Sequence, residues 1–324
     1  MEFCFFGTSS GAPTLTRNVS GLALRPRQSR GWYLVDCGEG SQHQAQRAGL
    51  SLQSLRAVFL THVHGDHCYG LPGLLASAGM GGRTEPLSVV GPRALDHWLQ
   101  SVRQHTELHL GYPVEFQAVD EHPSGAVLWE DAQVSVCAHP LSHRVPSFAY
   151  AFAATPPPAG LDRAALAALG VPQGPLWGQL QRGEAVRLAS DEAVHPDQVR
   201  LPPARPQRVV VAGDNDTAAL MAACGPADVW VHEATYTAEV LAKVGLAPQH
   251  SSAEQIARAA AMQQVPNLVL THFSARYGDD SRRSPSLADV EAEARAHYPG
   301  RLFLARDLAV YELDGEGVLT QRPS

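Results

Sequence analysis

Three histidines and one aspartate occupy four of the six positions between residues 62 and 67 of this 324-residue chain. They are His62, His64, Asp66 and His67, and they directly follow the apolar run at residues 57–60. This run predicts a strand whose end presents all four side chains in one loop. Imidazole and carboxylate groups bind Zn²⁺ at roughly 2.0–2.2 Å. Because four local donors exceed what one tetrahedral ion needs once distant residues contribute, the spacing favours two adjacent metal ions.

Three further candidate ligands share one sequence context, since each lies near the C-terminal end of an apolar run. They are His143 after residues 134–138, Asp214 after residues 209–213, and His272 after residues 268–271. Taken singly, each is also compatible with an ordinary surface residue. Taken together, they complete two coordination spheres, in which the carboxylate of Asp214 could bridge the ions. Such donors accept Zn²⁺, Mn²⁺ or Co²⁺.

Short β-rich runs and helical patterns alternate along the chain, and together they predict a layered α/β fold. We expect strands at residues 2–6, 21–24, 32–36, 57–60, 134–138, 148–152, 208–212, 229–232, 268–271, 302–305 and 308–313. We expect helices at residues 41–48, 69–77, 93–107, 252–264 and 286–297. Ser252 and Gln255 have the spacing of a capping box at the start of the fourth helix.

One segment interrupts this pattern, because residues 153–207 are rich in proline and glycine. So long an irregular stretch within a compact domain is usually functional or disordered. We therefore expect a single domain over residues 1–324 with an inserted flexible arm at residues 154–207. Within the arm, only residues 161–169 have the pattern of a short helix.

The bulk composition restricts the class of protein. No apolar run approaches the roughly 20 residues that a membrane helix needs, so we expect no membrane partner. The five cysteines form no C-x-x-C pair, which suits a reducing cytoplasm. The net charge of −7 disfavours general nucleic-acid binding. A metal cluster and a local basic patch can still bind a polyanion, because the position of the charge matters.

The His-x-His-x-Asp-His string resembles the hallmark of the metallo-β-lactamase superfamily. More specific segments resemble the ribonuclease Z family, and these are residues 6–13, 36–42, 169–176, 232–235, 250–252 and 271–277. The resemblance implies a four-layer αββα sandwich, with the metals at one sheet edge and an arm that binds tRNA. It also implies a homodimer in the cytoplasm whose substrate is precursor tRNA.

The resemblance assigns the ligands to two Zn²⁺ ions per subunit, with Mn²⁺ or Co²⁺ as possible substitutes. One ion is held by His62, His64, His143 and Asp214. The other is held by Asp66, His67, Asp214 and His272. Asp66 is also the presumed proton acceptor of the family.

Two metal ions roughly 3.5–4 Å apart can share a water and lower its pKa towards 7. We expect the resulting hydroxide to attack phosphorus and release the 3′ trailer, leaving a 3′-hydroxyl on the tRNA. His250 is the candidate that protonates the departing oxygen, and Glu233 would orient it. Nothing in the sequence decides between endonucleolytic and exonucleolytic action.

Further residues are candidates for substrate contacts. Arg276 could clamp a phosphate. The others are Ser274 beside it, Arg17 and Asn18 in an early loop, the Gly174-Pro175 turn of the arm, and Arg163, Arg182 and Arg187 of the arm. An exposed salt bridge or a solvated face remains an alternative for each arginine.

The chain departs from the family pattern at three positions: Leu15 replaces a usual basic residue, and Asn215 and Ser252 replace usual threonines. We expect the metal site to tolerate the latter two and contact with the tRNA acceptor end to change at Leu15. Two other functions remain open at this point. One is a small-molecule phosphodiesterase or arylsulfatase-like hydrolase, which would not need the arm. The other is a non-catalytic, metal-stabilised RNA-binding protein.

Overall fold

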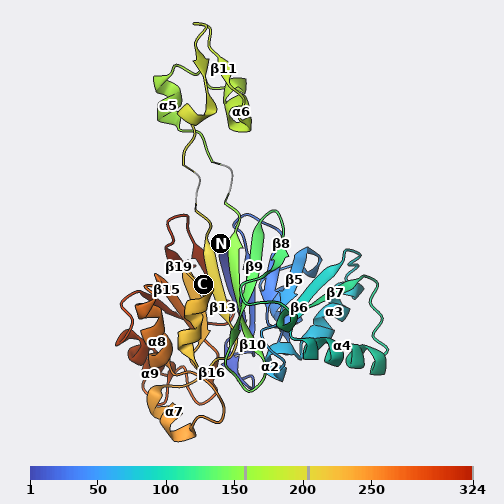
Figure 1. Cartoon of the computed structure of the whole chain (residues 1–324). Coiled ribbons are helices and arrows are strands. Elements are labelled where there is room, and N and C mark those ends of the chain that lie inside the picture. The colour runs from blue at the N-terminus through green and yellow to red at the C-terminus, as the bar shows by residue number, and fades with distance from the viewer. Residues whose placement is uncertain (157–158, 203–204, 323–324) are drawn as a thin grey trace. The chain divides into compact units, whose positions relative to one another are not determined.

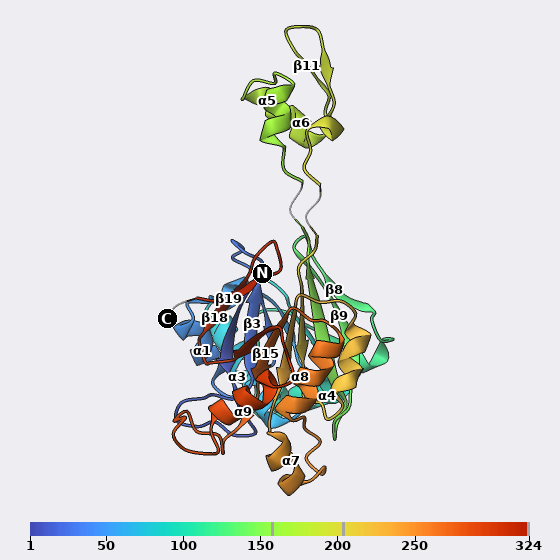
Figure 2. The same cartoon turned by 90° about the vertical axis from the view of Figure 1, so that its left-hand side faces the viewer.

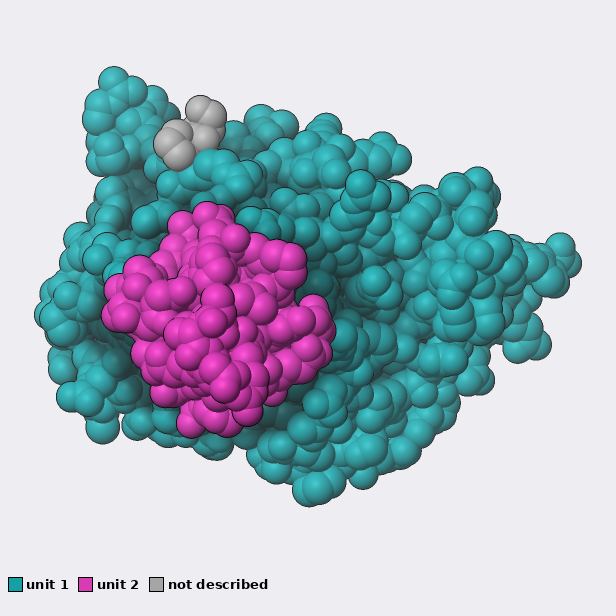
Figure 3. All heavy atoms as spheres, turned by 90° about the horizontal axis from the view of Figure 1, so that it is seen from above, with its two compact units in different colours: residues 1–154, 207–324 teal, residues 155–206 magenta. Residues whose placement is uncertain are grey.

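The computed structural model describes residues 1–156, 159–202 and 205–322. Pro157, Pro158 and Pro203 of the proline-rich segments lie outside these ranges. The chain divides into two compact units, which Figure 3 colours separately. The first comprises Met1–Ala154 and Gln207–Ser324, and the second comprises Thr155–Pro206.

The first unit contains two large sheets. One sheet has eight strands in the order β19-β18-β1-β3-β4-β5-β6-β7. Their bounds are Leu319–Gln321, Val310–Leu313, Glu2–Gly7, Gly21–Arg25, Trp32–Val35, Leu55–Phe59, Leu87–Gly91 and Val114–Ala118. The other sheet has seven strands in the order β17-β15-β14-β13-β10-β9-β8. Their bounds are Arg301–Leu304, Asn267–Thr271, Val229–Glu233, Arg208–Ala212, Ser147–Ala154, Val134–Leu141 and Val127–Glu130.

Helices cover the outer faces of both sheets (Figures 1 and 2). The first sheet packs against α1 (Ser41–Arg47), α3 (Leu71–Met80) and α4 (Arg93–His105) in one apolar cluster. The second packs against α8 (Ala253–Met262), α9 (Leu287–Arg295) and the 3₁₀ helix η4 (Ala218–Cys224) in another. A third cluster lies between the sheets and includes Phe5, Phe59, Phe152 and Tyr311. These layers confirm the predicted αββα sandwich.

Burial on both faces explains the sequence of the inner strands. In β1, Phe3 and Phe5 point into the cluster between the sheets, whereas Phe6 points into the cluster under the helices. Such strands read as nearly continuous apolar runs instead of alternating patterns. The start of α8 is also as predicted, since Ser252 and Gln255 form a capping box.

Some elements differ from the sequence prediction. The expected helix at residues 69–77 is α3, which begins at Leu71 and follows the one-turn helix α2 (Gly65–Cys68). The strands β6, β7 and β8 and the short helix α7 (Ala238–Val244) were not predicted. The short paired strands β2 (Ser9–Ser10) and β16 (Phe273–Ser274) were also missed, because only tertiary contact brings these two segments together.

The second unit has its own small core. It contains α5 (Arg163–Ala168), α6 (Pro175–Arg182), the paired strands β11 (Val186–Arg187) and β12 (Ala193–Val194), and the 3₁₀ helix η3 (Pro196–Gln198). Its buried side chains are Leu166, Val171, Leu180, Val186, Val194 and Val199. The expectation of a mostly irregular segment was therefore wrong, because apolar residues scattered among the prolines and glycines converge into one cluster.

The sheet of the first unit is continuous at the point where the second unit is inserted in the chain. The strands β10 and β13 pair antiparallel, and the backbone N–H of Ala154 donates to the carbonyl of Gln207 at 2.9 Å. The insertion therefore lies between two neighbouring strands of one sheet. Among the described residues, no helix combines the length and apolar character needed to cross a bilayer.

Candidate metal centre

Strand ends supply the polar side chains of the candidate site. The segment at residues 62–67, which includes the start of α2, follows β5, while His143 follows β9, Asp214 follows β13, and His272 follows β15. His272 has a φ of 58°, which places it in the left-handed region. A residue other than glycine rarely adopts this conformation, and such residues are concentrated at functional sites. The structure thus brings together all seven side chains predicted as ligands.

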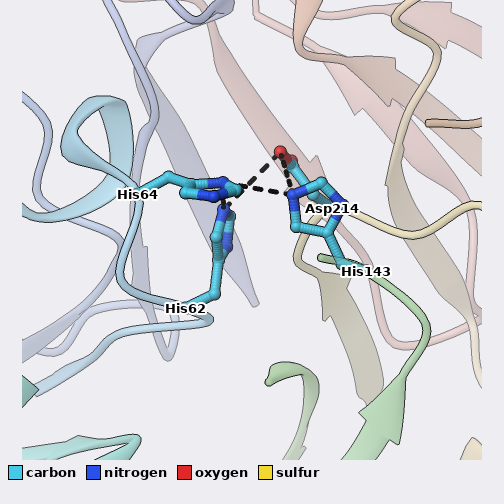
Figure 4. Close-up of side chains that lie close together, drawn as sticks. All are labelled: His62, His64, His143 and Asp214. Carbon is cyan, nitrogen blue, oxygen red and sulfur yellow. Dashed lines mark hydrogen bonds and ion pairs between the residues drawn. The ribbon is translucent and has the colours of Figure 1, made fainter. Parts of the chain in front are cut away.

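The first ligand set surrounds His64 (Figure 4). The Nε2 atoms of His62 and His143 each lie 3.1 Å from the Nδ1 atom of His64. The same two Nε2 atoms each lie 3.6 Å from the Oδ2 atom of Asp214. Four potential ligand atoms therefore face one another. Three are imidazole nitrogens and one is a carboxylate oxygen.

The second ligand set uses the other oxygen of the same carboxylate. The Oδ1 atom of Asp214 lies 3.4 Å from the Nε2 atoms of both His67 and His272. The Oδ2 atom of Asp66 lies 3.5 Å from the His67 Nε2 atom and 3.2 Å from the His272 Nε2 atom. Asp214 thus stands between the two sets, with one oxygen facing each.

The spacing of these donors fits metal ions. Four ligands placed 2.0–2.2 Å from a common tetrahedral centre lie about 3.4 Å apart. The distances within each set range from 3.1 to 3.6 Å. Without a metal ion between them, these closely spaced imidazole and carboxylate groups would have no shared binding partner. The cluster can therefore hold metal ions, and the two oxygens of Asp214 face one ligand set each.

Neighbouring oxygen atoms fix the orientation of the histidine rings. Four histidines direct Nε2 to the centre, and the Nδ1 atom of each contacts an oxygen. The pairs are His62 with Thr61 Oγ1 at 2.9 Å, His67 with Asp36 Oδ2 at 2.7 Å, His143 with the Gln249 carbonyl at 2.8 Å, and His272 with Thr235 Oγ1 at 3.0 Å. Such contacts select the ring tautomer that leaves Nε2 free for a metal.

The electrostatic surroundings suit cation binding. Burial and the neighbouring His67 hold the pKa of His62 well below its ordinary value. Burial opposes ionisation of Asp214, but His272 and His67 outweigh it and hold the pKa of this carboxyl well below its usual range. A neutral imidazole and an ionised carboxylate are the forms that bind a metal.

Beside the predicted metal ligands, His250 and Glu233 form the predicted pair. The Nδ1 atom of His250 lies 3.1 Å from Glu233 Oε1, and Glu233 is buried at the end of β14. Burial disfavours a charge on His250, but the Glu233 carboxylate outweighs burial and raises the pKa of His250 to about 9. The Glu233 carboxylate therefore favours the protonated form of this imidazole.

Arg276 and Ser274 lie near this pair. The guanidinium of Arg276 is exposed and stacks over the ring of Tyr236 at 5.2 Å. Its Nε atom donates to Ser274 Oγ at 3.0 Å. The Tyr236 ring in turn contacts the imidazole of His250, with 5.9 Å between the ring centroids. This places a cation one aromatic ring away from His250.

Arg17 has a different environment. It is 6% exposed, its Nη2 atom donates to the Tyr277 carbonyl at 2.7 Å, and its Nη1 atom forms an ion pair with Asp279 at 3.1 Å. Asn18 donates through Nδ2 to the carbonyl of Glu39 at 2.9 Å. The structure therefore shows Arg17 joining two loops, and does not bring it into the ligand cluster.

The remaining predicted residues belong to the second unit. Gly174 precedes α6 with a φ of 148°, and Pro175 occupies the first turn of that helix, where its fixed φ is favourable. Gly174-Pro175 thus begins a helix. Two of the predicted arginines form exposed ion pairs, Arg182 with Glu184 and Arg187 with Asp191, each at 2.9 Å, while Arg163 is exposed.

Sequence reasoning missed residues that support the site. Asp36, which accepts from His67, was not given a role, although it directly follows an apolar strand as the ligands do. Its position directly after an apolar strand could have identified Asp36 from the sequence. Thr235 and Tyr236 were missed because their contacts depend on how separate strand ends meet, and no local pattern marks this.

Comparison with known proteins agrees with this geometry. Residues 20–149 match the model of the metallo-beta-lactamase superfamily. The chain is 47% identical to ribonuclease Z of Pseudomonas putida over 98% of this chain and 99% of that protein. It is 46% identical to ribonuclease Z of Marinobacter nauticus over 97% of both chains.

Solved structures show the same fold. The short form of human tRNase Z has a TM-score of 0.63 at 24% identity, with 97% of this chain and 100% of that chain covered. The structural similarity to human tRNase Z shows the fold. The sequence identity to the bacterial ribonuclease Z proteins shows the family. The chain therefore belongs to the ribonuclease Z family, within the metallo-beta-lactamase superfamily.

Proposed function

We propose that this chain is a metal-dependent endoribonuclease that removes the 3′ trailer from precursor tRNA and leaves a 3′-hydroxyl on the tRNA. The observation that carries the proposal is the bridging position of Asp214 between two ligand sets, beside the His250–Glu233 pair. A phosphodiester hydrolase needs both features, since charge on the phosphate must be neutralised and the leaving oxygen must be protonated. The names of the relatives point to the same activity.

The ions that we assign to the centre are two Zn²⁺ per subunit, with Mn²⁺ or Co²⁺ as possible substitutes. His62, His64, His143 and Asp214 would hold one ion. Asp66, His67 and His272 would hold the other together with Asp214, whose Oδ1 atom faces both histidines. When bound, such ions withdraw charge from phosphate oxygens and make water a stronger nucleophile at neutral pH.

The side chains then have distinct tasks. Asp66 accepts the proton of the attacking water. His250 donates its proton to the departing 3′ oxygen of the tRNA, and Glu233 keeps the imidazole oriented and protonated. Arg276 offers its exposed guanidinium to a phosphate oxygen next to the reacting one.

The second unit, residues 155–206, would bind tRNA away from the reaction centre through Gly174, Pro175 and Arg163. It contains five arginines and five acidic residues, so its formal net charge is zero. Binding there must therefore depend on the placement of individual arginines. We further propose that the enzyme acts in the cytoplasm as a homodimer, in which the arm of one subunit serves the centre of its partner. Arg17 would support the loop at residues 14–18 next to the RNA.

The direct test is incubation of the zinc-loaded protein with a precursor tRNA labelled at its 5′ end, followed by mapping of the new 3′ end. We expect one tRNA-length product that carries a 3′-hydroxyl. The Asp66→Ala variant should give no such product. Unchanged cleavage by that variant would refute the mechanism, and stepwise shortening of the trailer would replace endonucleolytic by exonucleolytic action.

A further inference from the structure

We propose that Tyr69 and Trp98 form a stacking platform for an unpaired nucleobase next to the scissile phosphate. The inference rests on the proposed function and adds a binding site to it. Neither Tyr69 nor Trp98 is among the predicted site residues. In the described part of the chain, neither the Tyr69 hydroxyl nor the Trp98 indole N–H forms a hydrogen bond with a predicted metal ligand.

Tyr69 lies directly after residues 62–67, which carry four of the predicted metal ligands and are called the metal-binding loop below. It follows α2, two residues after the ligand His67, and its ring lies against Gly65. A Cβ atom added at Gly65 would stand 2.2 Å from the Tyr69 ring. The glycine between the ligands His64 and Asp66 thus makes room for this ring, which fixes the ring beside the centre.

The Tyr69 side chain is unusually open to solvent for an aromatic residue. It is 57% exposed, and it is the one aromatic among the large exposed apolar side chains of the described ranges. A tyrosine ring that is buried in the core stabilises the fold, whereas the exposed part of a ring makes no such contribution. Residues 63–66, which include the Gly65 that lies against the ring, are themselves partly exposed. The platform therefore borders the side on which the metal-binding loop meets solvent.

Trp98 holds the exposed ring in place. The two rings stack with their centroids 5.9 Å apart and their planes inclined by 28°. Trp98 belongs to α4 and packs partly against the apolar cluster beneath it, so that it is anchored. A ring held in this way, with more than half of its surface exposed, loses little conformational freedom when it binds a flat partner.

Unpaired bases are the partners that suit such a surface. Proteins recognise single-stranded RNA by stacking splayed bases on aromatic rings, with little dependence on base identity. The nucleotides that flank the cleavage point of a tRNA precursor are unpaired, and one of them must lie next to the loop that binds the metals. The base on either side of the scissile phosphate has this chemistry, and the experiment distinguishes the two.

The test compares wild type with Tyr69→Leu, Tyr69→Phe and the matched control Met80→Ala, which removes another exposed apolar side chain. Each protein is given precursor tRNA that is intact, abasic on the 5′ side of the scissile phosphate, or abasic on its 3′ side. Zinc content and sedimentation are measured for each variant. Binding of the same RNAs is followed by fluorescence anisotropy.

Tyr69→Leu should raise KM and Kd for intact precursor roughly 5- to 150-fold, with little change in kcat. Tyr69→Phe should restore both constants, and Met80→Ala should match wild type. One abasic precursor should weaken binding to wild type by a similar factor and show no further loss with Tyr69→Leu, which identifies the stacked base.

Three results would overturn the platform. These are an unchanged Kd for Tyr69→Leu, equal further losses with both abasic precursors, and a change in oligomeric state without a change in Kd, which would make the pair a protein contact. A wild type that binds the RNAs without cleaving them would instead refute the proposed function, while the variants would still test the platform by binding.

Discussion

The Nδ1 atom of His250 lies 3.1 Å from the Oε1 atom of Glu233, whose carboxylate is almost wholly buried. Glu233 also accepts hydrogen bonds from the backbone N–H groups of Asn215, Ser251 and Thr235. The carboxylate therefore has a fixed position, and it imposes one orientation and a raised pKa on the imidazole. The proposed role of His250 as proton donor would therefore require no reorganisation of its side chain.

Replacing His250 tests this role. We expect His250→Ala to lower kcat for precursor tRNA by about 10²- to 10⁴-fold, which is the usual contribution of a positioned general acid. The metal content should stay at the wild-type level, since neither of the two ligand sets assigned above includes His250, although its imidazole lies close to Asp214 and His272. The exposed His43 provides the control variant His43→Ala, which should be unaffected. A His250→Ala protein that loses its metals would identify this residue as a ligand instead.

The pH dependence of kcat tests whether Glu233 raises the pKa of His250. His250 must be protonated to act, so activity falls as pH rises through its pKa. Glu233 raises that pKa, and Glu233→Gln removes the charge responsible. The alkaline limb of the kcat–pH profile should therefore move to lower pH in Glu233→Gln. A limb that stays in place would show that another group sets it.

Asp36 should matter through His67. Its Oδ2 atom accepts from His67 Nδ1 at 2.7 Å, while Oδ1 accepts from the backbone and hydroxyl of Thr61. We expect Asp36→Asn to weaken metal affinity by roughly 10- to 100-fold, as for other supporting carboxylates. Competition with a fluorescent chelator measures this affinity. Asp280, which is partly exposed and paired with Arg282, supplies the control Asp280→Asn, and equal affinities in the two variants would contradict the assignment.

Deleting the second unit separates tRNA cleavage from small-substrate hydrolysis. The hydrogen bond between Ala154 and Gln207 allows residues 155–206 to be replaced by an Asn-Gly turn, which suits a two-residue hairpin. We expect turnover of a bis-aryl phosphodiester to persist, while KM for precursor tRNA rises and depends less on salt. Equal losses for the two substrates would show that the unit is not a tRNA exosite.

The convergence of the seven predicted ligands was predictable from sequence because these side chains follow strands. His62 and His67 are close in the chain, and His143, Asp214 and His272 each end an apolar run, so that parallel or neighbouring strands deliver them to one edge. The sandwich was predictable for the same reason, since strands buried on both faces leave strong apolar runs. Resemblance to a family then assigned each ligand to one of the two sets.

Other features depend on contacts that sequence does not encode locally. Arg17 looked like a surface cation, but Asp279 and the Tyr277 carbonyl hold it in a buried position. The core of residues 155–206 was missed because short apolar stretches between prolines carry no clear period. Tyr69 shows the same limit, since only the fold reveals that its ring lies on Gly65 beside the centre.

The most direct measurement is the zinc content of the purified protein by elemental analysis, before and after replacement of Asp214. We expect about two equivalents per subunit in wild type. Asp214→Ala, which removes an oxygen from each ligand set, should lose both ions and all cleavage of precursor tRNA. Full activity in protein that a chelator has freed of metal, or two tightly bound ions in Asp214→Ala, would contradict the account.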